Sequence, residues 1–202
     1  MNNTASTMPR LRDQLTTQGV VSRLVVTMTG RQDYRITTTA ASTDSAALQL
    51  ELPDLVMQFT SAEQVQHLLG FVAFGVQASM GMVTNYAQYD PTPQQVARMR
   101  NTVTWIATPT GTATREQMTH TVIKGQTIPY LTLVFDPVAL RVLDTTALRS
   151  LIDALRTAHR TAIAVFPDGR QYTADPTRRD WKPTGPEFGR RGHGWTTPDE
   201  DD

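Results

Sequence analysis

The sequence LQLELPDLVMQF at residues 48–59 has the same pattern as LTLVFDPVALRV at residues 131–142, which lies 83 positions further on. Each stretch contains two apolar runs separated by an adjacent proline and aspartate. Apolar residues alternate most clearly at Leu48, Leu50 and Leu52, and a period of two is typical of a strand with one buried face. We therefore predict two strands joined by a tight turn in each stretch.

A helix is expected directly after each pair of strands. Ser61 and Gln64 have the spacing of a capping box, and Asp144 stands where the second copy would need its N-cap. The apolar residues behind the two caps follow the i, i+3, i+4, i+7 spacing of one helical face. They are Val65, Leu68, Leu69 and Val72 in the first copy and Leu148, Leu151, Ile152 and Leu155 in the second.

Earlier strands complete the repeat. We predict strands at residues 24–29 and 34–39 in the first copy, and at 103–108 and 118–123 in the second, with a loop at 109–114. The predicted class is α+β: two tandem copies of a four-stranded antiparallel meander followed by a helix, plus a disordered C-terminal tail. The expected segments are 1–19 with a short helix at 9–17, the repeat 20–84, a linker 85–102 with a short helix at 93–100, the repeat 103–174 and the tail 175–202.

The first predicted helix is apolar nearly all round, because Phe71, Ala73 and Phe74 add to its usual stripe. A helix without a polar face is buried on both sides, so we expect it between the two sheets or at a subunit contact. Residues 62–80 are the expected surface of a homo-oligomer. The apolar run at 68–83 is shorter than the roughly 18–20 residues that span a bilayer, which predicts a buried helix and no membrane contact.

Composition excludes several kinds of site. The 202 residues include no cysteine, so there is no disulfide framework and no thiolate nucleophile or metal ligand. We expect a cytoplasmic protein, since the N-terminus lacks the pattern of a signal peptide. No nucleotide-binding glycine loop, nucleophile elbow or histidine pair at metal spacing is present, which favours a non-enzymatic protein without a cofactor.

Aromatic and basic residues mark the candidate binding surfaces. On the sheet face that no helix covers we place Tyr34, Arg35, Trp105, Lys124 and Tyr130. The alternative is that Tyr34, Trp105 and Tyr130 are core rings. The formal net charge of the chain is zero, so the sequence has no strongly basic domain.

The C-terminal tail carries a second candidate surface. Its arginines are interleaved with tryptophan, a combination that suits phosphates and bases. The candidate residues are Arg178, Arg179, Trp181, Arg190 and Arg191, and a protein partner is expected at the acidic tip, Asp199, Glu200, Asp201 and Asp202. The alternative is a solubilising tail with no partner. Before the tail, residues 163–166 and 170–174 are expected to form one more hairpin around the turn at 167–169.

The tandem arrangement of strands and helix, carried by residues 48–76 and 131–158, resembles the Whirly family of single-stranded DNA-binding proteins and the related transcriptional coactivators. The resemblance covers residues 20–161 and concerns architecture. It implies that the two helices pack together and that the sheets bind unpaired strands through aromatic and basic side chains. The tail with its acidic tip is similar in plan to that of bacterial single-stranded DNA-binding proteins.

Two functional hypotheses follow. The first is a binder of single-stranded DNA or RNA that acts in replication, recombination or transcription. The second is a protein-interaction module, such as an assembly factor, a chaperone-like adaptor or a component of a viral or mobile-element particle. The resemblance and the tail favour the first hypothesis. The near-neutral charge and the apolar helix favour the second.

Overall fold

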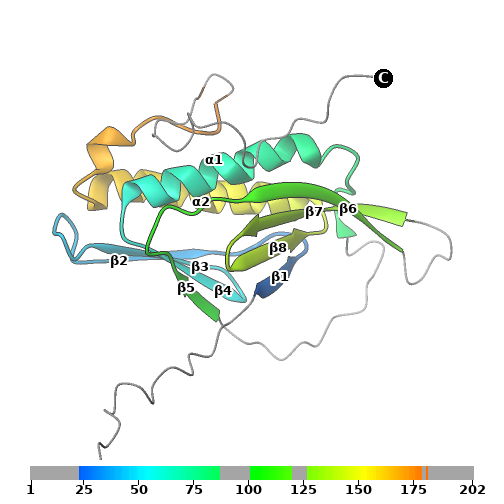
Figure 1. Ribbon diagram of the computed structural model, residues 1–202, viewed down its shortest axis with the longest axis horizontal. Coiled ribbons are helices and arrows are strands. Elements are labelled where there is room, and N and C mark those ends of the chain that lie inside the picture. Colours follow the sequence, from blue (N-terminus) through cyan, green and yellow to red (C-terminus); the bar gives the residue numbers. More distant parts are fainter. Residues whose placement is uncertain (1–22, 87–100, 120–126, 179–180, 182–202) are drawn as a thin grey trace, which may run out of the picture.

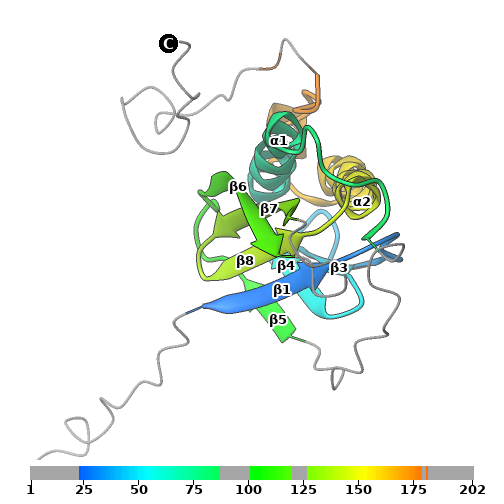
Figure 2. The same cartoon turned by 90° about the vertical axis from the view of Figure 1, so that its right-hand side faces the viewer.

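The fold combines two sheets with one pair of helices. The structure is a computed structural model that describes residues 23–86, 101–119, 127–178 and Trp181. In chain order the elements are β1 (Leu24–Met28), β2 (Arg35–Thr39), β3 (Ala47–Glu51), β4 (Leu55–Phe59), α1 (Ala62–Ala78), β5 (Asn101–Thr104), β6 (Thr112–Thr119), β7 (Thr127–Phe135), β8 (Val138–Val142), α2 (Thr145–Val165) and the 3-10 turn η3 (Gly169–Gln171). Sheet A has the order β1-β8-β7-β6, and sheet B has the order β2-β3-β4-β5. Figure 1 and the turned view in Figure 2 show α1 beside α2 on one side of the strands, which confirms the α+β class.

Matching structures are found at residues 48–59 and 131–142. Leu48 pairs with Phe59 across β3 and β4, and Leu131 pairs with Val142 across β7 and β8, at positions 83 residues apart. Each pair of antiparallel strands leads into a helix. The Ser61 hydroxyl accepts a hydrogen bond from the Gln64 N–H at 3.2 Å at the start of α1. The predicted order of strand, strand and helix is therefore confirmed in both stretches.

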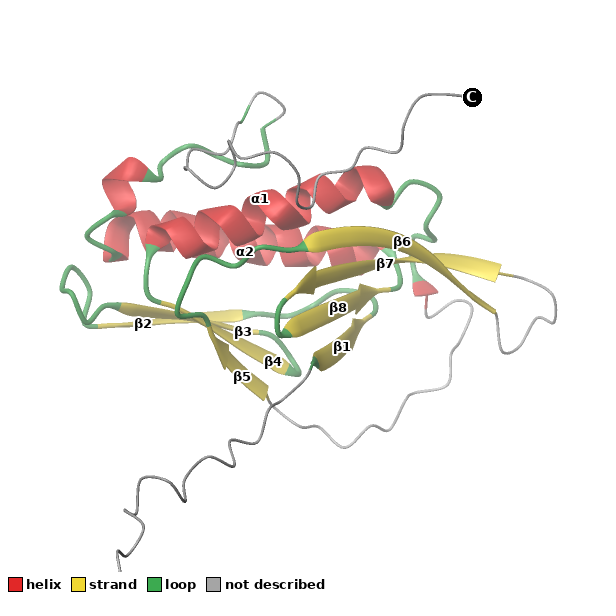
Figure 3. Cartoon of the chain, viewed as in Figure 1, coloured by secondary structure: helices red, strands yellow, loops and turns green. Residues whose placement is uncertain are grey.

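The first strand of each predicted meander belongs to the other sheet, which corrects the prediction of two purely antiparallel meanders. β1 lies parallel to β8 in sheet A, and β5 lies parallel to β4 in sheet B. Figure 3 shows both pairs. Alternating apolar residues specify which side of a strand is buried, but they do not specify its neighbour. Val26 and Met28 are buried in sheet A, where they pair with Leu140 and Val142 of β8.

The helices also connect the two halves, residues 24–78 and 101–165. The two helices pack on each other. Among the strands, α1 follows β4 but packs mainly on β6 and β7, and α2 follows β8 but packs mainly on β3. Gly75 permits this approach, because a Cβ atom there would lie 3.0 Å from the Leu133 side chain and 3.2 Å from that of Leu131. Buried residues of both sheets and both helices form one hydrophobic cluster. The two halves are therefore interlocked: each half places one strand in the sheet of the other half and packs one helix on that sheet.

α1 is covered on two sides within the chain. Phe71 is buried, as predicted, whereas Phe74 is only half-buried and so departs from the prediction. The helix lies between sheet A and the segment that follows α2, not between the two sheets. Most apolar side chains of α1 are thus buried by contacts within a single chain. Neither described helix combines the length and the apolar composition that crossing a membrane requires.

Two local predictions are corrected by the structure. β6 begins at Thr112, inside the predicted loop at 109–114, and ends at Thr119. The predicted hairpin at 163–174 is absent, because α2 continues to Val165 and η3 follows. Ala158, Ala162 and Val165 are buried and extend the apolar stripe of the helix, which explains the continuation. The short helices predicted at 9–17 and 93–100 lie outside the described residues.

The chain after α2 folds back over both helices. We call residues 166–178 with Trp181 the C-terminal strap. The Gln66 side-chain amide donates to the carbonyl oxygens of Tyr172 at 3.1 Å and Ala174 at 2.7 Å. Arg156 of α2 donates to the Thr177 hydroxyl at 3.0 Å. The predicted free tail from residue 175 is thus corrected for its first residues, and the rest of that tail lies outside the described residues.

A buried histidine joins the strap to α2 and predicts a pH dependence. The Nε2 atom of His159 lies 2.8 Å from the Tyr172 carbonyl oxygen, and burial lowers the pKa of the imidazole below its ordinary value. The unfolded chain therefore binds more protons than the folded chain below about pH 6.5. We expect the free energy of unfolding to fall as the pH drops from 7 to 5.

Urea denaturation at several pH values tests this expectation. The matched variant is His159→Gln, whose side-chain amide can still donate to the Tyr172 carbonyl but does not titrate. Its free energy of unfolding should change less over the same range, and the difference between the two proteins isolates His159 from other titrating groups. Equal pH dependence in both proteins would contradict the assignment.

Candidate nucleic-acid interface

Sheet B presents one face that neither helix covers. Its other face carries Leu48, Leu50, Met57 and Phe59, all fully buried in the common core. Because side chains alternate along a strand, the intervening residues point away from the helices. Figures 1 and 3 show both helices on the opposite side of this sheet. We call the set pointing away the polar face: Arg35, Thr37, Thr39, Ala47, Gln49, Glu51, Val56, Gln58, Thr102 and Thr104.

The polar face is organised in cross-strand rows. One row runs through Thr37, Gln49, Gln58 and Thr104, and the Thr104 hydroxyl donates to Gln58 Oε1 at 3.2 Å. The adjacent row begins at Arg35, which is exposed and lies opposite Glu51. Hydroxyl and amide groups both donate and accept hydrogen bonds, and guanidinium groups pair with phosphates. These are the side-chain types that contact nucleic-acid backbones.

The corresponding face of sheet A is chemically different. Tyr130 donates a hydrogen bond to Glu116 on the adjacent strand β6. This bond lowers the pKa of the Glu116 carboxyl and raises the pKa of the Tyr130 phenol from their ordinary values, and the positive charge of Arg141 contributes to lowering the former. Ile128 and Tyr130 are buried on this side, whereas Thr27, Thr112, Thr114 and Arg141 are exposed there.

Two of the three candidate rings are core residues. Trp105 is 6% exposed and stacks on Phe59 with ring centroids 5.6 Å apart, and its indole N–H donates to the Asp136 carbonyl at 3.3 Å. Tyr130 is 8% exposed. For both, the alternative of a core ring is correct, and neither is available to stack on a base. Alternation along a strand could not reveal this, because it does not show which sides of a sheet are covered.

Tyr34 and Arg35 are both exposed, but they point to opposite sides of their strand. The Tyr34 hydroxyl lies 3.0 Å from the Thr157 hydroxyl of α2, so its ring, 41% exposed, faces the helix layer. Arg35 lies on the polar face. The structure therefore separates the aromatic and cationic residues that the sequence analysis grouped together.

The other candidate residues lie in the strap or outside the described chain. Arg178 is exposed, and Trp181 packs against α1, where a Cβ atom on Gly70 would lie 2.8 Å from its ring. Outside the described residues are Lys124, Arg179, Arg190 and Arg191 and the acidic tip, Asp199 to Asp202. The threonine and glutamine rows of sheet B were not predicted from the sequence, although the spacing of Thr37 and Thr39 is a signal for one polar side of a strand.

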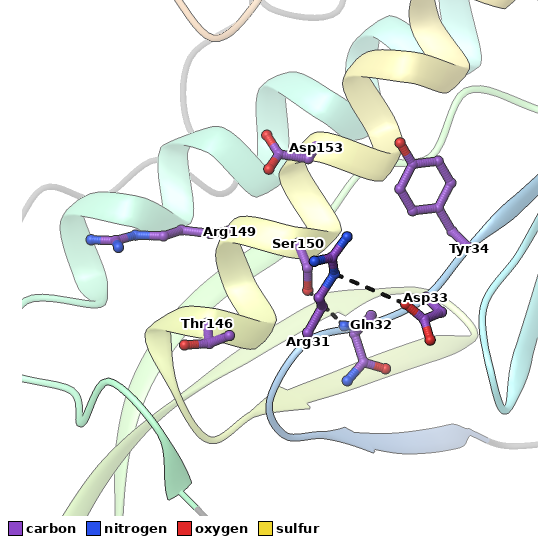
Figure 4. Close-up of a pocket in the computed structure, with 8 residues that line it drawn as sticks. All are labelled: Arg31, Gln32, Asp33, Tyr34, Thr146, Arg149, Ser150 and Asp153. Atoms are coloured by element: carbon purple, nitrogen blue, oxygen red, sulfur yellow. Dashed lines mark hydrogen bonds and ion pairs between the residues drawn. The ribbon is translucent and has the colours of Figure 1, made fainter.

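A shallow groove of about 930 Å³ lies between the β1–β2 turn and α2. Its lining residues are Arg31, Gln32, Asp33, Tyr34, Thr146, Arg149, Ser150 and Asp153, all labelled in Figure 4. The Gln32 N–H donates to the Ser150 hydroxyl at 3.0 Å, which joins the turn to the helix. A smaller depression lined by Arg149, Ile152, Asp153 and Arg156 lies next to it on α2. We call the two together the α2 groove.

The charges of the α2 groove are mixed. Arg31 lies 3.9 Å from Asp33, with both side chains highly exposed, and Arg156 lies 3.4 Å from Asp153. Figure 4 shows Arg149 and Asp153 projecting from the same side of α2. Among the described residues, Arg149 has no hydrogen-bond or ion-pair partner. The groove thus offers an unpaired guanidinium group beside carboxylates and one aromatic ring.

Comparisons of the chain with protein-family models, with curated proteins and with solved structures find no match.

Proposed function

We propose that this chain is a non-enzymatic protein that binds single-stranded nucleic acid on the polar face of sheet B. The observation that carries the proposal is the pattern of threonine, glutamine and arginine side chains on a sheet face that no described helix covers. An unpaired strand lying across these rows would find a cation for phosphates at Arg35. It would find hydroxyl and amide groups for phosphate oxygens and base edges at the neighbouring positions.

The proposal includes the internal duplication and the Whirly-like architecture. Two observations support them. β8 begins 83 residues after β4, and the N-cap Asp144 likewise stands 83 residues after the N-cap Ser61. The two helices also pack against each other. The exchanged strands make the two copies interdependent. In this account the duplication supplies the framework, and the polar face of sheet B supplies accessible polar groups that contact a single strand.

Recognition on this face is polar, with little stacking. The described residues of the polar face include no aromatic side chain, and Trp105, which follows β5, is buried, so this face offers no accessible ring among the described residues. Binding should therefore depend weakly on sequence and should weaken with salt. Each neutralised phosphate contributes a slope of about −0.7 to the logarithm of the binding constant against the logarithm of salt concentration for single strands.

Arg35→Ala is the direct test of the proposed surface. We expect affinity for an unstructured oligonucleotide to fall by about three- to tenfold and the salt slope to become shallower by about 0.7, because one phosphate contact is lost. The matched control is Arg160→Ala, which removes an exposed arginine from α2 and should change affinity by less than about twofold. Fluorescence anisotropy at two salt concentrations measures both quantities. Equal effects of the two substitutions would remove the support for a site on sheet B.

The second candidate function is a protein-interaction module. The mixed charges and the exposed ring of the α2 groove favour this function at a surface separate from the polar face.

A further inference from the structure

Sheet A contains a row of side chains that matches the central row of the polar face. In sheet B the row joins, strand by strand, Thr37, Gln49, Gln58 and Thr104. The corresponding pairings in sheet A join, in the same order, Thr114, Thr132, Arg141 and Thr27. Figure 3 shows the strands of each sheet side by side. We call the second set the Arg141 row.

The two rows occupy equivalent positions of the two halves. Thr132 and Arg141 stand 83 positions after Gln49 and Gln58, the same separation as between the two helix N-caps. In both rows a threonine from each outer strand flanks the two central residues. The main difference is that the Arg141 row carries a cation at its centre.

Arg141 is available to a ligand. Its side chain is exposed and makes no hydrogen bond or ion pair with the described residues. Thr27 lies directly opposite it on β1 and is exposed, and Thr114 is exposed at the far end of the row. Guanidinium and hydroxyl groups both donate hydrogen bonds to phosphate oxygens. The row therefore presents donors to solvent around one unpaired positive charge.

The carboxylate nearest to the row in the register of the sheet is held by another residue. Glu116 follows Thr114 by two positions on the same side of β6 and accepts a hydrogen bond from Tyr130. This bond lowers the pKa of the Glu116 carboxyl, with smaller contributions from Thr132 and from the charge of Arg141, so the group is ionised at neutral pH. Glu116 and Arg141 form no ion pair. The carboxylate thus leaves Arg141 unpaired and opposes the binding of an anion beside it.

We propose that the Arg141 row binds the phosphate backbone of the single strand and is a second contact surface for nucleic acid, on sheet A. The inference rests on the proposed function and extends it beyond sheet B. Arg141 pairs with a phosphate, and the hydroxyls of Thr27 and Thr114 donate to phosphate or sugar oxygens on either side. The row contains no aromatic side chain, so its contacts position the strand without reading its bases.

The proposal makes the salt dependence quantitative. Each sheet then contributes one accessible arginine, Arg35 in sheet B and Arg141 in sheet A. Two phosphate contacts correspond to a slope of about −1.4 in the logarithm of the binding constant against the logarithm of salt concentration.

The test measures binding of the full chain to a fluorescein-labelled thymidine oligonucleotide by anisotropy at several salt concentrations. We expect Arg141→Ala to weaken binding by about three- to tenfold and to make the salt slope shallower by about 0.7. The double variant with Arg35→Ala should lose about 1.4 from the slope, whereas Arg141→Lys keeps the charge and should retain most of it. Arg160→Ala is the matched control on α2 and should change affinity by less than about twofold.

Glu116→Gln supplies a change of opposite sign. The amide oxygen can still accept the hydrogen bond from Tyr130, but the negative charge near Arg141 is removed. Affinity for the oligonucleotide should therefore rise by about two- to threefold. Thermal unfolding of each variant shows whether it remains folded, and a purely structural role of Glu116 would not produce tighter binding.

Two results would overturn the inference while leaving the proposed function intact. One is an equal effect of Arg141→Ala and Arg160→Ala where Arg35→Ala still weakens binding, which confines the strand to sheet B. The other is weaker or unchanged binding in Glu116→Gln. Absence of oligonucleotide binding by the unchanged protein would refute the proposed function and this inference together. Dependence on Arg141 without dependence on Arg35 would support the Arg141 row and place the site on sheet A alone.

Discussion

Residues 20–86 expressed alone are expected to show no cooperative unfolding transition as a monomer. In that fragment β1 would lack β8, its parallel neighbour, and α1 would lack β6 and β7, on which it packs. Leu68, Leu69 and Phe71 would lose part of the surroundings that bury them. Exposing such side chains costs roughly 1.5–3 kcal/mol each, which is large beside the total stability of a small domain.

Circular dichroism during urea titration, with sedimentation to establish the oligomeric state, measures this effect. Co-expression with residues 101–181 supplies both missing elements and is expected to restore a cooperative transition in a complex of the two fragments. A monomeric fragment that unfolds cooperatively by itself would show that the two halves are independent, contrary to the interlocked arrangement.

Replacing Asp144 by alanine is expected to destabilise the chain by about 3–5 kcal/mol. The carboxylate is fully buried and accepts three backbone hydrogen bonds: Oδ1 accepts from the Ala147 N–H at 2.7 Å, and Oδ2 accepts from the Gly30 N–H at 2.8 Å and the Tyr86 N–H at 3.0 Å. One carboxylate thus caps α2 and holds two chain segments that precede β5 in the sequence. Its removal leaves three N–H groups without this acceptor.

Urea denaturation gives the free energy of unfolding for this comparison. Asp144→Asn should be intermediate, because the amide oxygen can still cap the helix but the amide nitrogen cannot accept from the other N–H groups. Asp153→Ala is the control, since this exposed aspartate of α2 should contribute no more than about 0.5 kcal/mol. A loss below about 1 kcal/mol in Asp144→Ala would show that the three hydrogen bonds do not stabilise the junction as described.

The local structure of each half could be predicted from the sequence because its signals act over short distances. Alternation at Leu48, Leu50 and Leu52 defines a strand with one buried side, and Ser61 and Asp144 mark where the helices begin. These features depend on backbone geometry and capping chemistry, which nearby residues control. Partner choice does not follow in the same way. Nothing in the residues of β1 distinguishes a parallel neighbour in the second half from an antiparallel neighbour in the first.

The candidate site was predictable only where exposure follows from alternation alone. Arg35 is exposed as expected, because β2 is an edge strand with one polar side. Trp105 is buried because Phe59 and Phe135 enclose it, and these rings come from different sheets. The contact of the strap with α1 was not predicted either, because it brings the strap back to Gln66 and Gly70 from more than a hundred positions further along the chain. Long-range contacts of this kind leave no local pattern.

A titration of the intact protein with an unstructured single strand and with duplex DNA, at several salt concentrations, tests the central functional claim most directly. The account predicts saturable binding to the single strand that is tighter than binding to the duplex. It also predicts that this binding weakens with salt at a slope corresponding to one to three phosphate contacts, about −0.7 to −2.1. Absence of salt-sensitive binding to the single strand would contradict the proposed function.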